Sequence, residues 1–227
     1  MKRINNFESM EIILNFKVEE RQALVRYWPS FLTQLESKEL YDEIYNLKNE
    51  YFSADVYKIF NKDIVAPRLT AAFGEKGIVY GYAGMSRETI DLWPKLLLQC
   101  KQKIQDQLGV TLNYAFINIY EVKDLSGNKC DHYIGWHADK EKDIIQDSDG
   151  GTTICSVSLG DPRKFQLRKT YKKGEPPTRI YSQVLENGSL CTMEKHTQIL
   201  CKHQVPKKRK ATTPRINITF RNMKKKI

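Results

Sequence analysis

Three side chains in the C-terminal half of the sequence are of types that bind a redox-active metal. His137 and Asp139 are two residues apart, so in extended backbone both side chains point to the same side. His203 follows later and would have to come from a neighbouring strand. Two imidazoles and one carboxylate can occupy one face of a six-coordinate iron and leave three positions for a cosubstrate and oxygen. The pattern predicts oxidative chemistry.

The last predicted strand, residues 215–221, carries a second group of polar residues. Ile216, Ile218 and Phe220 share one face, which should pack in the core of a sheet. The opposite face holds Arg215, Asn217, Thr219 and Arg221. That face is either solvated or a row of hydrogen-bond donors suited to carboxylates. Its ends lie about 20 Å apart at roughly 3.3 Å per residue, so both arginines must lean inward to hold one small diacid.

The elements that must position these groups fall into two halves. Apolar residues recur at helical spacing after Ser37, and again between Pro94 and Gly109. From residue 111 onward the period changes to two. Strands are predicted over 111–120, 153–159, 190–193, 197–201 and 215–221. Many short strands after a helical half predict an α+β fold, in which helices support a two-sheet β-sandwich.

Composition favours a soluble, globular chain. The 227 residues are 41% hydrophobic and 28% charged, which is enough for one well-buried domain. No apolar run approaches the roughly 20 residues that a membrane helix needs, and no secretory signal is evident. The five cysteines are an odd number without a CxxC pair, so we expect free thiols in a reducing compartment. A zinc site from Cys130, His132, Cys201 and His203 would fit no common ligand spacing.

The net charge of +10 is the second strong feature of the chain. A basic excess attracts nucleic acid, although solubility alone would also explain it. The charge is concentrated in the half that carries the metal-type residues. The basic clusters are Arg168-Lys169 with Lys172-Lys173, Lys207-Lys208-Arg209-Lys210, and Lys224-Lys225-Lys226.

Several motifs, taken in order, resemble AlkB-type dealkylases of the Fe(II)/2-oxoglutarate dioxygenase superfamily. The nearest resemblance is to the animal-type members that repair duplex DNA, and it covers about three quarters of the chain. The motifs are Pro67-Arg68, Tyr80-Gly81-Tyr82-Ala83-Gly84, Asn118-Ile119-Tyr120, Ile134–Asp139, Ser156–Phe165, Gly188-Ser189-Leu190 and Pro214–Arg221. The resemblance implies a double-stranded β-helix (jelly-roll) core over residues 49–227, with a helical extension over residues 1–48 that buttresses the sheets.

The resemblance also implies the cofactors and their ligands. Fe(II) would be held by His137, Asp139 and His203, and the cosubstrates would be 2-oxoglutarate and O₂. The residues implied to contact 2-oxoglutarate are Asn118, Tyr120, Arg215, Asn217, Thr219 and Arg221. No side-chain nucleophile or general base is required. The implied reaction hydroxylates the N-methyl carbon of bases such as 1-methyladenine and 3-methylcytosine, and the unstable product releases formaldehyde and the repaired base.

A third group of residues is implied to hold the nucleic acid. A base in a duplex must be flipped out to reach such a metal, so its site needs aromatic and apolar walls. The substrate-binding residues implied are Phe60, Arg68, Tyr80, Gly81, Tyr82, Lys140, Glu141 and Arg163. Phe60 stands where duplex-acting relatives carry an apolar finger, although it could equally be a core residue. Phosphate contacts are implied for Arg168, Lys172, Lys173, Lys207, Lys208, Arg209 and Lys210.

Lys140 departs from the family pattern, because duplex-repairing relatives carry an acid directly after the metal-binding aspartate. The preferred lesion is therefore open. We expect a monomeric DNA oxidative demethylase that favours alkylated duplex DNA, contacts no membrane and acts inside the cell, for example in the nucleus. The alternatives are an RNA or single-strand demethylase of the same family, a non-catalytic basic nucleic-acid-binding protein, and a protein hydroxylase on the same core.

Overall fold

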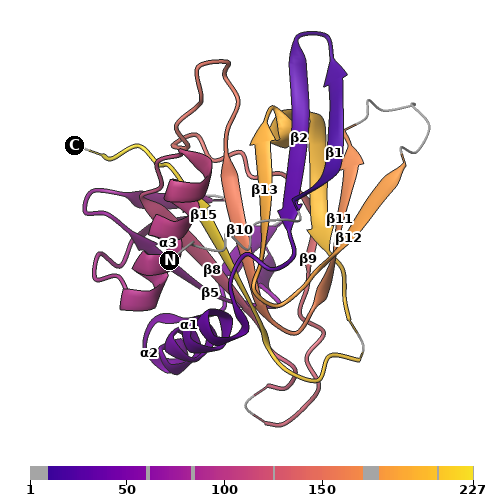
Figure 1. The fold of residues 1–227 in the computed structure, drawn as a ribbon. Coiled ribbons are helices and arrows are strands. Elements are labelled where there is room, and N and C mark those ends of the chain that lie inside the picture. Colours follow the sequence, from indigo (N-terminus) through magenta and orange to yellow (C-terminus); the bar gives the residue numbers. More distant parts are fainter. Residues whose placement is uncertain are drawn as a thin grey trace, which may run out of the picture.

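The computed structural model describes residues 10–59, 62–82, 85–124, 126–170, 179–208 and 210–226, with the backbone alone at 57–59, 80, 82 and 85–88. Two antiparallel sheets dominate it (Figure 1). The major sheet has the order β1 (Glu11–Val18), β2 (Arg21–Trp28), β13 (Ser189–Lys195), β10 (Ile154–Gly160), β15 (Arg215–Arg221), β8 (Tyr114–Tyr120) and β5 (Leu69–Gly74). The minor sheet has the order β12 (Ile180–Leu185), β11 (Arg163–Lys169), β14 (Cys201–Val205) and β9 (Ile134–His137).

Two small hairpins and four helices complete the fold of the described residues. The hairpins are β3 (Val56–Ile59) with β4 (Lys62–Val65), and β6 (Val79–Tyr82) with β7 (Met85–Glu88). The helices are α1 (Gln34–Asn46), α2 (Lys48–Tyr51), α3 (Lys95–Leu108) and α4 (Thr197–Leu200). No helix among the described residues is long and apolar enough to cross a membrane.

The two long helices begin and end at residues suited to those positions. Thr33 caps α1 in a capping box with Glu36, which satisfies two backbone N–H groups at the helix start. The carboxylate of Glu43 accepts from the backbone N–H of Leu96 in the first turn of α3. Gly109 ends α3 at φ +66°, a left-handed conformation that glycine adopts without strain.

Two hydrophobic clusters lie on the two faces of the major sheet. On one face, Ile44 of α1 and Ile104 of α3 are buried in the same cluster as Ile117, Val157 and Ile218. Figure 1 shows both helices on this side, with the minor sheet on the other. The second cluster, between the sheets, includes Phe116, Phe165, Leu167 and Val205. These layers agree with the predicted jelly roll.

The helical interpretation of residues 1–48 is correct for α1 and wrong for residues 11–28, which form the β1–β2 hairpin. Ala23, Val25 and Tyr27 are buried at alternate positions of β2, the period of a strand. β2 also pairs with β13, with Val25 opposite Met193. The hairpin is therefore an integral part of the major sheet.

The strand predicted over 197–201 is also wrong for most of its length. Residues 197–200 form the single helical turn α4, and the strand β14 begins only at Cys201. Lys195 has φ +57°, which ends β13, and the backbone N–H of His196 donates to Gln22 O at 2.8 Å. A hydrogen-bonded turn therefore follows β13 where the sequence predicted an extended strand.

Candidate metal and cosubstrate site

A β-bulge directs His137 into the space between the sheets. His203 of β14 lies opposite His137 of β9, and Val205 lies opposite Ile134. β9 therefore takes three residues where β14 takes two, the count of a bulge. As a result, Ile134 and His137 both line one cavity although they are three positions apart in the sequence. The alternation of a regular strand would point them to opposite faces.

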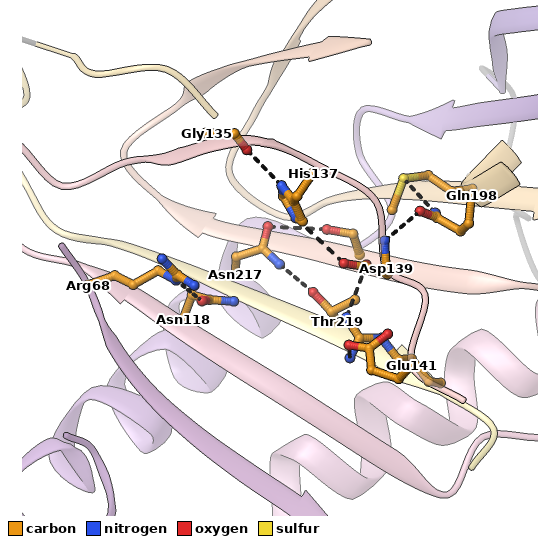
Figure 2. Close-up of polar contacts among 12 residues, drawn as sticks. Arg68, Asn118, Gly135, His137, Asp139, Glu141, Gln198, Asn217 and Thr219 are labelled. Carbon is orange, nitrogen blue, oxygen red and sulfur yellow. Dashed lines mark hydrogen bonds and ion pairs between the residues drawn. The ribbon is translucent and has the colours of Figure 1, made fainter. Parts of the chain in front are cut away.

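His137, Asp139 and His203 converge on this cavity. One donor atom from each lies within 4.8 Å of the donors of the other two. His137 Nε2 is 3.5 Å from Asp139 Oδ1, and the two imidazole rings are 4.1 Å apart at their centroids. His137 Nδ1 lies 2.8 Å from Gly135 O, so the proton belongs on Nδ1 and the lone pair of Nε2 faces the other donors (Figure 2).

The electrostatics of His203 and Asp139 suit a metal. Burial and the neighbouring His137 lower the pKa of His203 to about 3, so its imidazole is neutral at physiological pH. Burial opposes ionisation of Asp139, but Arg221 and the two histidines outweigh it and hold the pKa of this carboxyl well below its usual range. Neutral imidazoles and an ionised carboxylate are the forms that bind divalent metals. The donor set therefore fits Fe(II).

Arg221 bridges the carboxylates of Asp139 and Glu141. Its Nη2 is 3.0 Å from Asp139 Oδ2, and its Nη1 is 2.9 Å from Glu141 Oε1. Burial, together with the Asp139 charge, raises the pKa of Glu141 against the opposing effect of Arg221. Glu141 Oε2 has no hydrogen-bond partner among the described residues and lies in a side chain that lines the cavity.

Arg215 provides a buried cation with unused donors beside Asn217 of the cavity lining, although Arg215 itself does not line the cavity. It is 1% exposed, and its Nη2 donates to Ser158 Oγ at 2.9 Å and to Asn217 Oδ1 at 2.7 Å. Burial lowers its pKa to about 10, which still leaves it charged at neutral pH. Its Nε and Nη1 have no partner within the described chain. Since an unsatisfied buried donor is costly, a ligand carboxylate is the natural complement, and 2-oxoglutarate fits this requirement.

The remaining residues implied to bind 2-oxoglutarate lie on β8 and β15. Asn118 is opposite Asn217 in the strand register, and both line the cavity with Tyr120 and Thr219. Asn217 Nδ2 donates to Thr219 Oγ1 at 2.8 Å (Figure 2). The polar face of β15 is buried between the sheets, so the alternative of a solvated strand face is wrong.

Residues 24–221 match the 2OG-Fe(II) oxygenase superfamily. The chain belongs to this superfamily. It is accordingly an Fe(II)/2-oxoglutarate-dependent dioxygenase, and Fe(II), 2-oxoglutarate and O₂ are its cofactor and cosubstrates. When bound, the iron and 2-oxoglutarate supply the activation of oxygen.

Relatives within the superfamily are of the AlkB type. The chain is 32% identical to human "DNA oxidative demethylase ALKBH2" over 83% of its own length and 69% of that protein. It is 32% identical to human "Alpha-ketoglutarate-dependent dioxygenase alkB homolog 3" over 69% of its length and 52% of that protein. The solved structure of OsALKBH1 superposes with a TM-score of 0.53, covers 87% of this chain and 96% of that one, and is 15% identical, which shows the fold alone.

The residues implied to bind the substrate are only partly brought together. Arg68 and Glu141 line the cavity, and Arg68 Nε donates to Asn118 Oδ1 at 2.8 Å. Lys140 lines an adjacent hollow instead. Arg163 is buried outside the cavity lining, where its Nη2 donates to His132 O and Pro206 O at 2.9 and 2.8 Å. It ties two loops together, so a direct contact with substrate is not its evident role.

Other predicted contacts lie at the surface or outside the described residues. Gly81 is exposed on β6, while Phe60, the side chains of Tyr80 and Tyr82, Lys172, Lys173 and Arg209 are not described. Lys207 Nζ lies 3.6 Å from Asp131 Oδ2, and Lys208 Nζ lies 2.7 Å from Asp161 Oδ2. These two lysines are thus partly neutralised by acids. Arg168 lies with its guanidinium carbon 4.3 Å from the ring centroid of Trp136, and Lys210 is exposed.

The two histidines outside the metal-type triad have defined contacts. His132 is half-buried, and its Nδ1 accepts from the backbone N–H of Glu121 at 2.8 Å. His196 is buried at the start of α4 with Nε2 3.0 Å from Asp149 O. Among the described residues, the metal-type cluster is His137, Asp139 and His203, and the zinc alternative through Cys130 and Cys201 is not formed.

Sequence reasoning missed several residues of the site. Strand alternation could have identified Phe165 and Val205, because each is two residues from another inward-facing position of its strand. Phe116 and Ser156 could be found in the same way on β8 and β10. Gln198 could not, because it lies on the helical turn α4 that was predicted as a strand.

Proposed function

We propose that this dioxygenase demethylates N-alkylated bases such as 1-methyladenine and 3-methylcytosine in DNA, and thereby repairs alkylation damage. The observation that carries the proposal is one cavity in which the metal-type triad faces the donors of β15, in a chain whose relatives are named DNA oxidative demethylases. Its products would be formaldehyde and the repaired base. The protein would position the alkyl group and exclude water, while the cosubstrate supplies the oxidising power.

The charge of the minor sheet supports a nucleic-acid substrate. None of its four described strands contains an Asp or Glu. On the outward face, Lys164 and Lys202 are exposed, and Arg168 lies opposite Lys202 in the strand register. Exposed cations attract phosphates without regard to sequence. This distribution favours a polyanionic partner over a protein substrate.

Glu141 is suited to recognise an alkylated base. It lines the cavity beside Asp139, and its Oε2 has no hydrogen-bond partner among the described residues. A carboxylate oxygen in this position can accept from the exocyclic amino group of adenine or cytosine, and it can offset the positive charge of an N-methylated ring. The reversed charge at Lys140 lies in the adjacent hollow and would affect phosphates more than the base.

Duplex DNA is the substrate form that we propose. The β3–β4 hairpin presents Val56, Ile64 and Val65 as exposed apolar side chains. Phe60, the candidate finger, falls between the two strands in the sequence and lies outside the described residues. Exposed apolar groups on a hairpin suit entry into a base stack. We further propose that the protein acts as a monomer inside the cell, in a reducing compartment such as the nucleus, and its five free cysteines support this location.

The test is turnover by the purified protein with Fe(II), 2-oxoglutarate and methylated oligonucleotides. We expect formaldehyde and unmodified base from 1-methyladenine and 3-methylcytosine, with matched single- and double-stranded DNA and RNA compared. Asp139→Ala should abolish both products. Asp149→Ala, an exposed aspartate paired with Lys195, should leave them unchanged. Formaldehyde from none of these substrates would reject the proposal, and a strong preference for single-stranded RNA would reject its duplex-DNA form.

A further inference from the structure

A glutamine outside the predicted site hydrogen-bonds the backbone of a metal-ligand residue. Oε1 of Gln198 accepts from the backbone N–H of Asp139 at 2.9 Å, as Figure 2 shows. Nε2 of the same amide donates to Met193 Sδ at 3.3 Å, and Met193 lines the iron cavity. Gln198 is 4% exposed. Both ends of its amide are therefore engaged inside the protein, which fixes its orientation.

The backbone of Asp139 depends on this contact because of where it lies. β9 ends at His137, so Asp139 falls in the loop that follows, beyond the strand ladder. A buried N–H outside a ladder needs an acceptor from elsewhere. The side chain of Gln198, 59 positions away in the chain, provides this acceptor. The carboxylate of the same residue is held by Arg221, so Asp139 is fixed at both its backbone and its side chain.

The helical turn that carries Gln198 is itself fixed to the N-terminal hairpin. Thr197, 1% exposed, accepts at Oγ1 from the backbone N–H of Leu24 at 3.0 Å. Its hydroxyl also lies 3.1 Å from Leu24 O and 2.5 Å from Glu194 O. β2 thus holds α4, and α4 holds the loop of Asp139. The contacts form one continuous path from the hairpin to the metal ligand.

We propose that Gln198 is a positioning residue for the metal centre. It holds the Asp139 backbone so that one carboxylate oxygen faces His137 while the other stays on Arg221. Residues that orient a metal ligand commonly change metal affinity about 10–100-fold when they are replaced. The role concerns the iron site alone, so it holds whichever nucleic acid is the substrate.

The experiment compares three variants of the full chain by anaerobic Co(II) titration, followed through the visible absorption of the bound ion. Gln198→Leu removes both polar ends of the side chain. Gln198→Glu keeps an acceptor at the same reach, loses the donor to Met193, and adds a negative charge when the carboxyl group is ionised. Gln204→Leu is the matched control, because Gln204 lies on β14 with its amide bonded to Gln166. We expect Gln198→Leu to weaken Co(II) binding about 10-fold or more, and the other two variants to stay close to the parent protein.

Thermal unfolding of the metal-free variants separates positioning from a purely structural role. A structural role alone predicts a lower Tm for Gln198→Leu with unchanged Co(II) affinity well below that temperature, and this result would overturn the proposal. An equal loss of affinity in Gln198→Glu and Gln198→Leu would overturn the role of the acceptor. If Gln198→Leu does not fold, Thr197→Val tests the same path, with a smaller loss of Co(II) affinity expected and no loss contradicting the proposal. Since metal binding is the readout, absence of turnover on methylated DNA leaves these outcomes interpretable.

Discussion

The guanidinium of Arg221 lies 3.0 Å from Oδ2 of Asp139, and the other oxygen of that carboxylate lies 3.5 Å from His137 Nε2. The two oxygens therefore face different partners. Oδ1 is available to a metal, whereas Oδ2 is held by a cation that cannot lose its charge at physiological pH. Asp139 thereby stays ionised and correctly turned even though it is buried among other titratable groups.

Replacing Arg221 with methionine should weaken metal binding about 10–100-fold, because Asp139 would lose the contact that orients it and keeps it ionised. The metal affinity of Arg221→Lys should lie between those of the parent protein and Arg221→Met. Lysine keeps the charge but loses the forked donors that reach both Asp139 and Glu141. Anaerobic Co(II) titration measures the effect. Arg26→Met, which breaks a bidentate pair with Glu194 away from the metal, is the control.

Arg215→Lys should raise the KM for 2-oxoglutarate about 10–100-fold with a smaller change in kcat. Hydrogen bonds to a charged partner contribute about 1.5–3 kcal/mol, and the single ammonium of lysine cannot replace the two separate donors Nε and Nη1. Steady-state kinetics at saturating oligonucleotide measure both constants. A second check is thermal: 2-oxoglutarate should raise the Tm of the parent protein and have little effect on the variant. An unchanged KM would show that Arg215 does not hold the cosubstrate.

The stability of the metal-free protein should fall as the pH drops below about 6.5. Burial lowers the pKa of His132, and its Nδ1 must stay unprotonated to accept from Glu121. A histidine whose folded pKa is below its unfolded value stabilises the fold above the unfolded pKa, and this contribution declines as the pH falls toward the folded value. His203 acts in the same direction down to about pH 3.

Urea unfolding at pH 7.5 and 5.5 measures this decline. His132→Asn keeps a neutral acceptor near Glu121 and should therefore lose less stability between the two pH values than the parent protein. The same loss in both proteins would mean that His132 contributes nothing to the pH dependence and that His203 and other groups carry it.

Charge reversal on the outward face of the minor sheet should weaken binding to nucleic acid. For Lys164→Glu with Lys202→Glu we expect a higher Kd for a 20-nucleotide duplex. The slope of log K against log salt should also become shallower by roughly 0.9 for each phosphate contact that is lost. Lys95→Glu on α3, on the far side of the major sheet, should change neither. If Lys95→Glu changed the Kd and the salt slope as much as the double variant does, net charge, and not this face, would decide binding.

The parts of the fold that the sequence predicted well are those in which one pattern dominates locally. The alternation in β15 correctly separates the side chains between the sheets from those that face the helices, and Pro94 and Gly109 bound α3. Prediction failed where tertiary pairing overrides the pattern. The segment 11–28 becomes a hairpin because β2 completes the sheet beside β13, a partner more than 160 residues away.

The sequence predicted part of the candidate site and left the prediction incomplete. Types and spacing identify His137, Asp139 and the row on β15, because each type has a chemical role that few others can fill. Glutamine at position 198 carries no such signal, since its role comes entirely from the turn that places it. The bulge in β9 was equally hidden, because only pairing with β14 shows that Ile134 and His137 point to the same side.

β15 has the metal-side arginines on one face and Ile216, Ile218 and Phe220, all fully buried, on the other. A single inserted or deleted residue within this strand would exchange its two faces. The guanidinium groups would then enter the hydrophobic core between the major sheet and the helices. Such a change would cost the protein its fold and its chemistry together. Insertions and deletions should therefore be tolerated in the loops. Within β15, we expect substitutions to be tolerated but not insertions or deletions.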